Sequence, residues 1–372
     1  MHRRDFLKRA GSLALARPAL GAAGSLLTGR LLAAPQTDAR LLVVFLRGGY
    51  DSANLLVPAS SDFYYETRPT IAVPRPGQQD GALALTAEWA LHPRLRHSLL
   101  PLYEKKQVAF VAFAGSDDVS RSHFETQTTL ELGQALGGNR DYRSGFLNRL
   151  AQELGQDTSR PGAFTSGVPL ILNGRLDVHN LEMDDALKGL PFDAKQQGML
   201  DLMYRDTTLQ TTVKEGFAMR QATSDAIRRE IAGADGQAVS ANGLQGDLRR
   251  VAVIMREQFN IGFMDVGGWD THVNQGGEGG ILGYRLESLG HALAGFARGM
   301  GPAWDKTVVV VVSEFGRTFR ENGNRGTDHG YGTVYWVLGG GIRGGRIAGE
   351  QVKVAADTLH EDRDFPVLND YR

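Results

Sequence analysis

Short apolar runs alternate with longer segments of helical periodicity along this chain, and that alternation limits its fold more than any other feature. We predict strands at the apolar runs 41–46, 108–113, 168–172, 261–264 and 308–312. Helical patterns lie between them, at 94–105, 122–135, 143–155, 195–232, 244–258 and 281–299. Strands that alternate with helices predict an α/β sandwich around a mostly parallel sheet. Residues 175–250 contain no convincing strand, and we interpret them as a helical insertion.

Residues 1–34 have the composition of an export signal. The pair Arg3-Arg4, followed by Phe6-Leu7-Lys8, resembles a twin-arginine signal. A membrane anchor is the alternative, but it needs roughly 20 uninterrupted apolar residues, and Arg17 and Arg30 interrupt this stretch. We therefore expect the twin-arginine translocase to export the chain to the periplasm or beyond, without a stable membrane anchor.

Charge and cysteine content exclude several classes of function. The chain has 41 basic and 42 acidic side chains, a net charge of −1 and no cysteine. Residues 1–34 hold six of the basic groups and one of the acidic groups, so the remainder has 35 against 41, a net charge of −6. A nucleic-acid binder needs a basic face, so we expect no nucleic-acid partner. Without thiolates, any metal must bind imidazole, carboxylate or other oxygen ligands.

Acidic and imidazole side chains follow several of the apolar runs. Ligands of open parallel sheets bind beyond the carboxyl ends of the strands, and these residue types bind divalent ions. Asp270 with His272, and Asp328 with His329, each supply an anionic and a neutral ligand within one loop. A single aspartate such as Asp51 is more often a helix cap or turn residue. The metal hypothesis therefore depends on the repetition of these residues at successive strand ends.

Five motifs, taken together and in order, resemble those of one protein family. They are Arg47-Gly48-Gly49-Tyr50-Asp51, the run 121–127, Gly268-Trp269-Asp270-Thr271-His272, the run 313–318 and Thr327-Asp328-His329-Gly330. Over residues 38–372 the chain resembles the DUF1501 family of exported bacterial proteins, which looks like a branch of the alkaline phosphatase and sulfatase superfamily. The resemblance implies an alkaline-phosphatase-like α/β fold with one or two divalent ions, of Zn, Mn, Ca or Mg. It implies metal ligands at Asp51, Asp270, His272, Glu314, Asp328 and His329.

The chain departs from that superfamily at two points. Its members usually place an Asp-His pair where this chain has Glu314-Phe315, so one imidazole ligand is missing or is supplied elsewhere. The run nearest to a formylglycine motif, 159–163, lacks the arginine, which argues against a formylglycine sulfatase.

The glycine pattern at 339–344 has no helix pattern after it, and we interpret it as a loop, not a dinucleotide site.

Three further residues are candidates for chemistry, each with a structural alternative. Ser122 lies where phosphatases of the superfamily carry their nucleophile, but Ser122 with Glu125 also fits a capping box. Arg47 and Arg317 can clamp an oxyanion or can pair with nearby carboxylates.

The sequence predicts an exported, metal-dependent hydrolase of phosphate or sulfate esters, with a small-molecule or polymer ester as substrate and Ser122 or water as the attacking group. One alternative is a non-catalytic secreted envelope or assembly protein that retains the fold and a structural metal. Another is a single-metal carbohydrate-active hydrolase that uses water directly. The family pattern usually continues into a further helix beyond Asp370-Tyr371-Arg372, so we also expect the chain to be a fragment.

Overall fold

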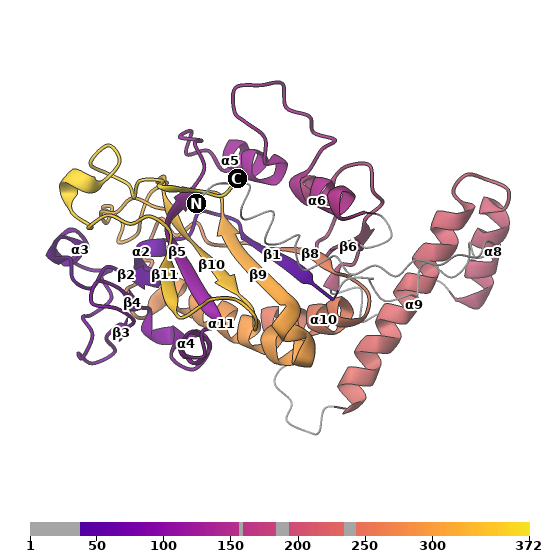
Figure 1. Cartoon of the computed structure of the whole chain (residues 1–372), viewed down its shortest axis with the longest axis horizontal. Helices are drawn as coiled ribbons and strands as arrows, with labels where there is room; N and C mark the ends of the chain where they lie inside the picture. Colours follow the sequence, from indigo (N-terminus) through magenta and orange to yellow (C-terminus); the bar gives the residue numbers. More distant parts are fainter. Residues whose placement is uncertain (1–37, 156–158, 184–192, 234–242) are drawn as a thin grey trace, which may run out of the picture.

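The computed structural model describes residues 38–155, 159–183, 193–233 and 243–372 (Figure 1). The predicted export signal, residues 1–34, lies outside the described residues. None of the helices in these ranges is both long and apolar enough to cross a membrane.

The described residues fold around one large, mostly parallel sheet. Its inner strands are β5 (Val108–Gly115), β10 (Thr333–Leu338), β9 (Thr307–Ser313), β1 (Arg40–Leu46) and β8 (Ile261–Val266), side by side in that order. Shorter strands flank them: β11 (Arg346–Ala348) and β12 (Asn369–Asp370) pair with β5, while β6 (Pro161–Ala163) and β7 (His179–Asn180) follow β8. The predicted α/β sandwich with a mostly parallel sheet is confirmed.

The strand directions decide where a site can form. β1 is parallel to both β8 and β9, and Val43 lies between Phe263 and Val310. β10 is antiparallel to β9 and to β5, so β5 points the same way as β9. The carboxyl ends of β1, β5, β8 and β9 therefore meet at one edge of the sheet, and β10 begins at that same edge.

Alternate side chains of β1 enter two separate cores, as the two-residue period of a strand requires. Leu42 and Val44 join the core on the face covered by α4 (Leu99–Glu104), α10 (Leu244–Glu257) and α11 (Gly280–Met300). Val43 and Phe45 join the smaller core beneath α5 (His123–Leu132) and α6 (Phe146–Leu154). The two helical layers lie on opposite faces of the sheet in Figure 1.

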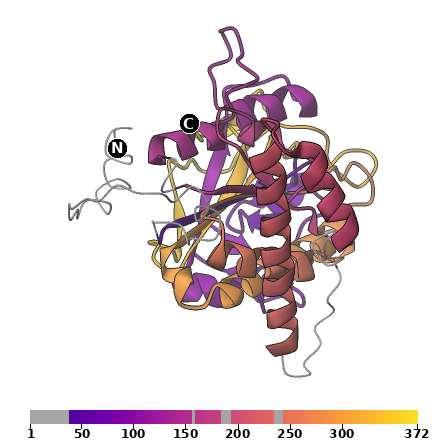
Figure 2. The ribbon, with the colours of Figure 1, turned by 90° about the vertical axis from the view of Figure 1, so that its right-hand side faces the viewer.

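The remaining elements surround this sandwich. A small antiparallel sheet has the order β2 (Leu56–Val57), β4 (Ala90–Leu91), β3 (Leu83–Ala84). It lies close in sequence to α2 (Ser52–Leu55), α3 (Asp62–Thr67) and the 3-10 turn η1 (Pro93–Leu95). Two more 3-10 turns are η3 (Gly301–Lys306), which precedes β9, and η4 (Ala356–Thr358). Helices α8 (Ala194–Tyr204) and α9 (Gln210–Gly233) form an arm at one side of the molecule (Figures 1 and 2).

The structure corrects three details of the predicted elements. The apolar run at 168–172 is not a strand; it contains the 3-10 turn η2 (Leu170–Leu172), with Ile171 buried beneath α6. The helical pattern at 195–232 is broken into α8 and α9, with Asp206 in the left-handed region at φ +64°. Within the segment interpreted as an insertion, β7 joins the main sheet and α10 packs on α11.

One buried histidine makes the stability of the fold sensitive to acid. His92 is fully buried; its Nε2 lies 3.0 Å from the Gly277 carbonyl, and its Nδ1 accepts from the Arg94 amide. Burial lowers the pKa of His92 from 6.5 to about 4. The unfolded chain therefore binds more protons than the folded chain between these two values, and stability falls as the pH decreases from 6.5 towards 4.

We predict that His92→Gln removes this part of the acid sensitivity, which amounts to about 3 kcal/mol at most. Urea unfolding at pH 7 and pH 4.5 measures the loss for each variant. The exposed His97 provides the control His97→Gln. Between pH 7 and pH 4.5 we expect this variant to lose as much stability as the wild type loses. An equal loss in His92→Gln and the wild type would contradict this assignment.

Candidate metal centre

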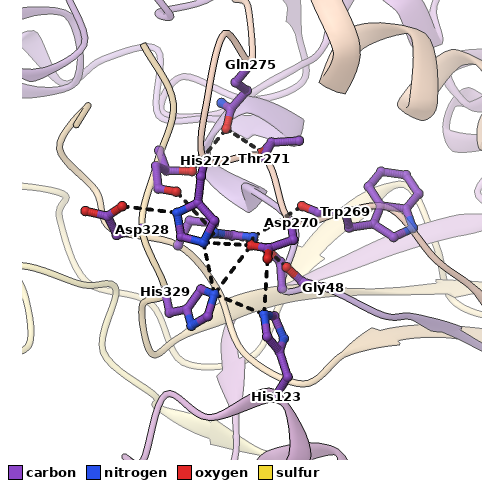
Figure 3. A network of polar contacts seen from close by, with 12 residues as sticks. Gly48, His123, Trp269, Asp270, Thr271, His272, Gln275, Asp328 and His329 are labelled. Atoms are coloured by element: carbon purple, nitrogen blue, oxygen red, sulfur yellow. Dashed lines mark hydrogen bonds and ion pairs between the residues drawn. The ribbon is translucent and has the colours of Figure 1, made fainter. Parts of the chain in front are cut away.

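Three histidines and one aspartate converge at the edge of the sheet where the parallel strands end. His123 is the first residue of α5, in the connection that follows β5. Asp270 and His272 lie in the loop after β8, and His329 lies shortly before β10. Figure 3 shows the three imidazole rings around the Asp270 carboxylate.

The donor atoms of these four side chains are close together. The Nε2 of His329 lies 3.0 Å from that of His123 and 3.1 Å from that of His272. The Oδ1 of Asp270 lies 2.9 Å from His272 Nε2 and 3.4 Å from His329 Nε2, and its Oδ2 lies 3.6 Å from His123 Nε2. Ligand atoms of His123, Asp270 and His329 all fall within 4.8 Å of one another, as in a group that could hold a metal ion. His272 adjoins this group through His329 and Asp270.

The other nitrogen of each ring faces an acceptor. Nδ1 of His123 lies 2.7 Å from a carboxylate oxygen of Glu314. Nδ1 of His272 lies 3.1 Å from a carboxylate oxygen of Asp328, and Nδ1 of His329 lies 3.0 Å from the backbone carbonyl of Arg121. Carbonyl and carboxylate oxygens accept hydrogen bonds, so Nδ1 carries the proton in each neutral ring. All three Nε2 atoms then present lone pairs towards the same carboxylate. Histidine ligands of metals are held by such a bond on their other nitrogen.

The spacing of the donor atoms fits a small divalent ion. Imidazole and carboxylate ligands bind zinc at about 2.0–2.2 Å, which places neighbouring donors of a tetrahedral site roughly 3.4 Å apart. The contacts among the four side chains run from 2.9 to 3.6 Å. Lone pairs and an anion at these distances repel one another unless a cation or a proton lies between them.

The pKa shifts around the centre have identifiable causes. The hydrogen bond that His123 donates to Glu314 raises the pKa of His123, whereas burial lowers the pKa of His329. Burial would raise the pKa of Asp270, but the Arg317 guanidinium outweighs it and the pKa is lowered. The pKa of Glu314 is lowered in the same way as that of Asp270. Burial would raise it, but the hydrogen bonds that Glu314 accepts, chiefly from His123, lower it. The centre therefore retains two carboxylates that stay ionised at neutral pH.

Glu314 and Asp328, two ligands expected from the resemblance, lie behind the histidines. Glu314 Oε1 accepts from the amide of Gly48 at 2.8 Å and from Gln127 at 2.8 Å, in addition to its contact with His123. Asp328 accepts from Asn322 at 3.0 Å as well as from His272. In this arrangement both carboxylates orient histidines.

Asp51, the expected ligand after β1, is occupied by other partners. Its buried carboxylate pairs with the fully buried Arg68, at 2.5 Å to NH1 and 3.1 Å to NH2. Gln275 donates to the same carboxylate at 2.5 Å, and the Ala53 amide donates at 3.3 Å. With both oxygens engaged, the structure does not bring Asp51 into the group of converging donors.

Both candidate arginines are engaged by the chain. Arg47 contacts Glu131 at 3.0 Å, Asp265 at 2.6 Å and Gln127 at 2.9 Å, which agrees with the ion-pair alternative. The buried guanidinium of Arg317 donates to Asp270 and faces His272 Nε2 at 3.4 Å. Its other partners are backbone carbonyls, those of Gly48, Gly49, Trp269 and Thr327. A guanidinium has five N–H groups, so these partners leave Arg317 no donor for a substrate.

Ser122 occupies the N-cap position of α5, directly before His123. Its side chain makes no capping hydrogen bond, so the capping-box alternative is wrong. Glu125 contacts Arg140 at 3.1 Å instead.

Sequence reasoning missed His123 as a candidate ligand. It lies within one of the five motifs and in the connection after an apolar run, and one imidazole of the expected set was unassigned. Those signals together could have identified His123 as a ligand. The contact between His123 and Glu314 could not be predicted from the sequence, because the two residues are 191 positions apart.

The family model described as "Protein of unknown function (DUF1501)" matches residues 38–372. No curated protein matches the sequence. A solved protein in the alkaline phosphatase superfamily from Vibrio parahaemolyticus is 13% identical, with a TM-score of 0.38, over 94% of this chain and 72% of its own.

Two other solved structures are more distant. Murine ectonucleotide pyrophosphatase/phosphodiesterase 5, an inactive form in complex with AMP, is 11% identical, with a TM-score of 0.28, over 75% of this chain. Ps i-CgsB is 11% identical, with a TM-score of 0.30, over 81% of this chain. The chain spans 57% of the first and 65% of the second, less than two thirds of either.

We predict that Asp51→Ala destabilises the fold by about 3–5 kcal/mol, because Arg68 would keep a buried, unpaired charge. The exposed Asp62 pairs with Arg75 at 2.5 Å, so Asp62→Ala is a matched control with an expected loss of at most about 1 kcal/mol. Urea unfolding at pH 7 measures both. An Asp51→Ala variant with wild-type stability and no bound metal would instead make Asp51 a ligand.

Proposed function

The chain belongs to the DUF1501 family, and from that premise we propose that it is an exported, metal-dependent hydrolase of phosphate or sulfate esters. The observation that carries the proposal is the convergence of three Nε2 atoms on the Asp270 carboxylate, with each Nδ1 facing an acceptor. His123, Asp270 and His329 would hold the ion, with His272 beside them. The imidazole-rich donor set favours zinc over magnesium or calcium.

A divalent ion bound there supplies Lewis-acid chemistry, which stabilises negative charge on an ester oxygen and lowers the pKa of a bound water. The residues around it keep the donors in place. Arg317 holds one oxygen of Asp270, and Glu314 holds the ring of His123. A rigid donor set of this kind reduces the reorganisation needed when charge develops on the transferred group.

Two attacking groups are compatible with hydrolysis. Ser122 precedes His123, and its hydroxyl is not used for capping. The amino end of α5 favours negative charge, which supports an alkoxide at this position. The other attacking group is water. In either route the nucleophile forms a bond to phosphorus or sulfur, the bond from that atom to the leaving oxygen breaks, and the leaving group departs as an alcohol with the proton that the nucleophile loses. In the Ser122 route, water then attacks the same phosphorus or sulfur, releases phosphate or sulfate and restores the serine hydroxyl.

One observation favours the rival function, a secreted envelope or assembly protein with a structural metal. The five N–H groups of Arg317 all face partners within the chain, so it is not available to clamp a transferred oxyanion, and Arg47 is held by two carboxylates. Export is part of both proposals and is supported by the paired arginines Arg3-Arg4.

Metal analysis with an ester screen tests the proposal. The purified chain is reconstituted with Zn, Mn, Ca or Mg and assayed on phosphate monoesters, phosphate diesters and sulfate esters. We expect stoichiometric metal and turnover in the wild type. His329→Ala should lower metal affinity and kcat/KM by at least about a hundredfold, because it removes a direct ligand. The exposed His97 supplies the control His97→Ala, which should match the wild type.

The remaining outcomes separate the alternatives. No stoichiometric metal with any of the four ions would refute the hydrolase proposal. Stoichiometric metal without turnover of any ester would support the structural-metal rival.

Ser122→Ala decides the identity of the attacking group. If Ser122 attacks, this variant should lose at least about a hundredfold in kcat while its metal content stays unchanged. Full activity in Ser122→Ala would assign the attack to water.

A further inference from the structure

A buried carboxylate outside the converging donors contacts two arginines. The side chain of Asp364 is fully buried. Its Oδ2 lies 3.0 Å from Nε and 2.8 Å from NH2 of Arg121. Arg363 NH1 approaches the same carboxylate from the adjacent position, at 3.1 and 3.3 Å. None of these contacts involves a donor atom of the candidate metal centre.

Both arginines contact His329, one of the converging histidines. The backbone carbonyl of Arg121 accepts the hydrogen bond from His329 Nδ1 at 3.0 Å. The guanidinium of Arg363 donates from NH2 to the backbone carbonyl of His329 at 2.9 Å. Asp364 is therefore linked through Arg121 to the ring of His329 and through Arg363 to its backbone.

The backbone of Arg121 needs support to present its carbonyl in this direction. Arg121 has φ +54°, in the left-handed region that non-glycine residues rarely adopt. The loop before Arg121 is tied at Asp118, which accepts from the Ser120 amide at 2.9 Å and from the Thr129 hydroxyl at 3.0 Å. Asp364 is itself anchored, because its amide and its carbonyl both pair with the backbone of His360, at 3.0 and 2.8 Å. The buried ion pair therefore joins an anchored residue to a strained one.

We propose that Asp364 is a positioning residue for the candidate metal centre: through Arg121 it fixes the carbonyl that sets the tautomer and ring orientation of His329. The proposal rests on the proposed function only in that His329 serves there as a metal ligand. The Arg121 carbonyl is the direct partner of His329, and loss of such a partner usually changes metal affinity by about 10–100-fold; Asp364 acts one contact further out, so its effect should lie at the lower end.

The same arginine provides a matched control. Glu361 contacts Arg121 NH2 at 2.5 Å, but its side chain is 60% exposed. Exposed ion pairs contribute little, so Glu361→Gln removes one charge from Arg121 without removing the buried partner. Arg121 and Arg363 have partly exposed side chains, so both can turn towards water when Asp364 is replaced, and the variants are expected to fold.

The first test reads the tautomer of His329 in the metal-free protein, so it does not depend on catalysis. Imidazole proton–nitrogen NMR correlations at pH 8, assigned with His329→Gln, report which ring nitrogen carries the proton. We expect the Nδ1–H form in the wild type and in Glu361→Gln, and a mixture of both tautomers in Asp364→Ala. A retained Nδ1–H form in folded Asp364→Ala would overturn the proposal.

The second test measures zinc affinity by competition with a chelator. Asp364→Ala should bind zinc about tenfold more weakly, the lower end of the range for loss of a direct partner of a ligand histidine, and Asp364→Asn, which can still accept from one arginine, should recover part of the loss. Glu361→Gln should stay within about twofold of the wild type. Equal weakening in Glu361→Gln and Asp364→Ala would refute a specific role for the buried carboxylate.

The two proposals fail in different ways. If the wild type binds no zinc, the proposed function fails, while the tautomer measurement still decides the role of Asp364. If Asp364→Ala does not fold, Asp364→Asn takes its place in both measurements and is held to the same criteria, with a smaller expected effect.

Discussion

The structure depends on three hydrogen bonds that fix the protonation of three histidines. The Nδ1 atoms of His123, His272 and His329 each face an oxygen acceptor, at 2.7 to 3.1 Å. Their Nε2 atoms are therefore left as acceptors around the carboxylate of Asp270. Parallel strands that end at one edge bring these residues together from distant parts of the chain. Four acceptors in so small a volume favour a bound cation, and this preference underlies the functional proposal.

Arg317 assembles the loops around that centre. It donates to backbone carbonyls after β1, after β8 and before β10, and to the Asp270 carboxylate. A buried guanidinium with all of its donors engaged holds three loops in one arrangement. It orients a candidate ligand and contributes no free donor to a substrate. The balance between the enzyme and the structural-metal alternative therefore depends on the ion and the nucleophile more than on an arginine clamp.

The sequence predicted the fold well where burial alone determines the pattern. Inner strands of a parallel sheet are covered on both faces and appear as continuous apolar runs, which located β1, β5, β8 and β9. The run at 168–172 misled the prediction because a buried 3-10 turn has the same composition. In the site, Asp270, His272 and His329 were found from their repetition at strand ends. The pairings of Asp51 with Arg68 and of His123 with Glu314 were not predicted, because no local pattern links residues so far apart in the sequence; Glu314 itself was expected only as a ligand. The Arg121 carbonyl depends on a backbone angle that no residue pattern specifies.

X-ray absorption spectroscopy of the zinc-loaded chain tests the central claim most directly. If the converging donors form one centre, the spectrum should show nitrogen and oxygen ligands at about 2.0–2.1 Å, with the outer-shell scattering of at least two imidazoles. That scattering should weaken in His123→Ala, the ligand that only the structure identified. A zinc site with oxygen ligands alone, or one unchanged in His123→Ala, would contradict the account.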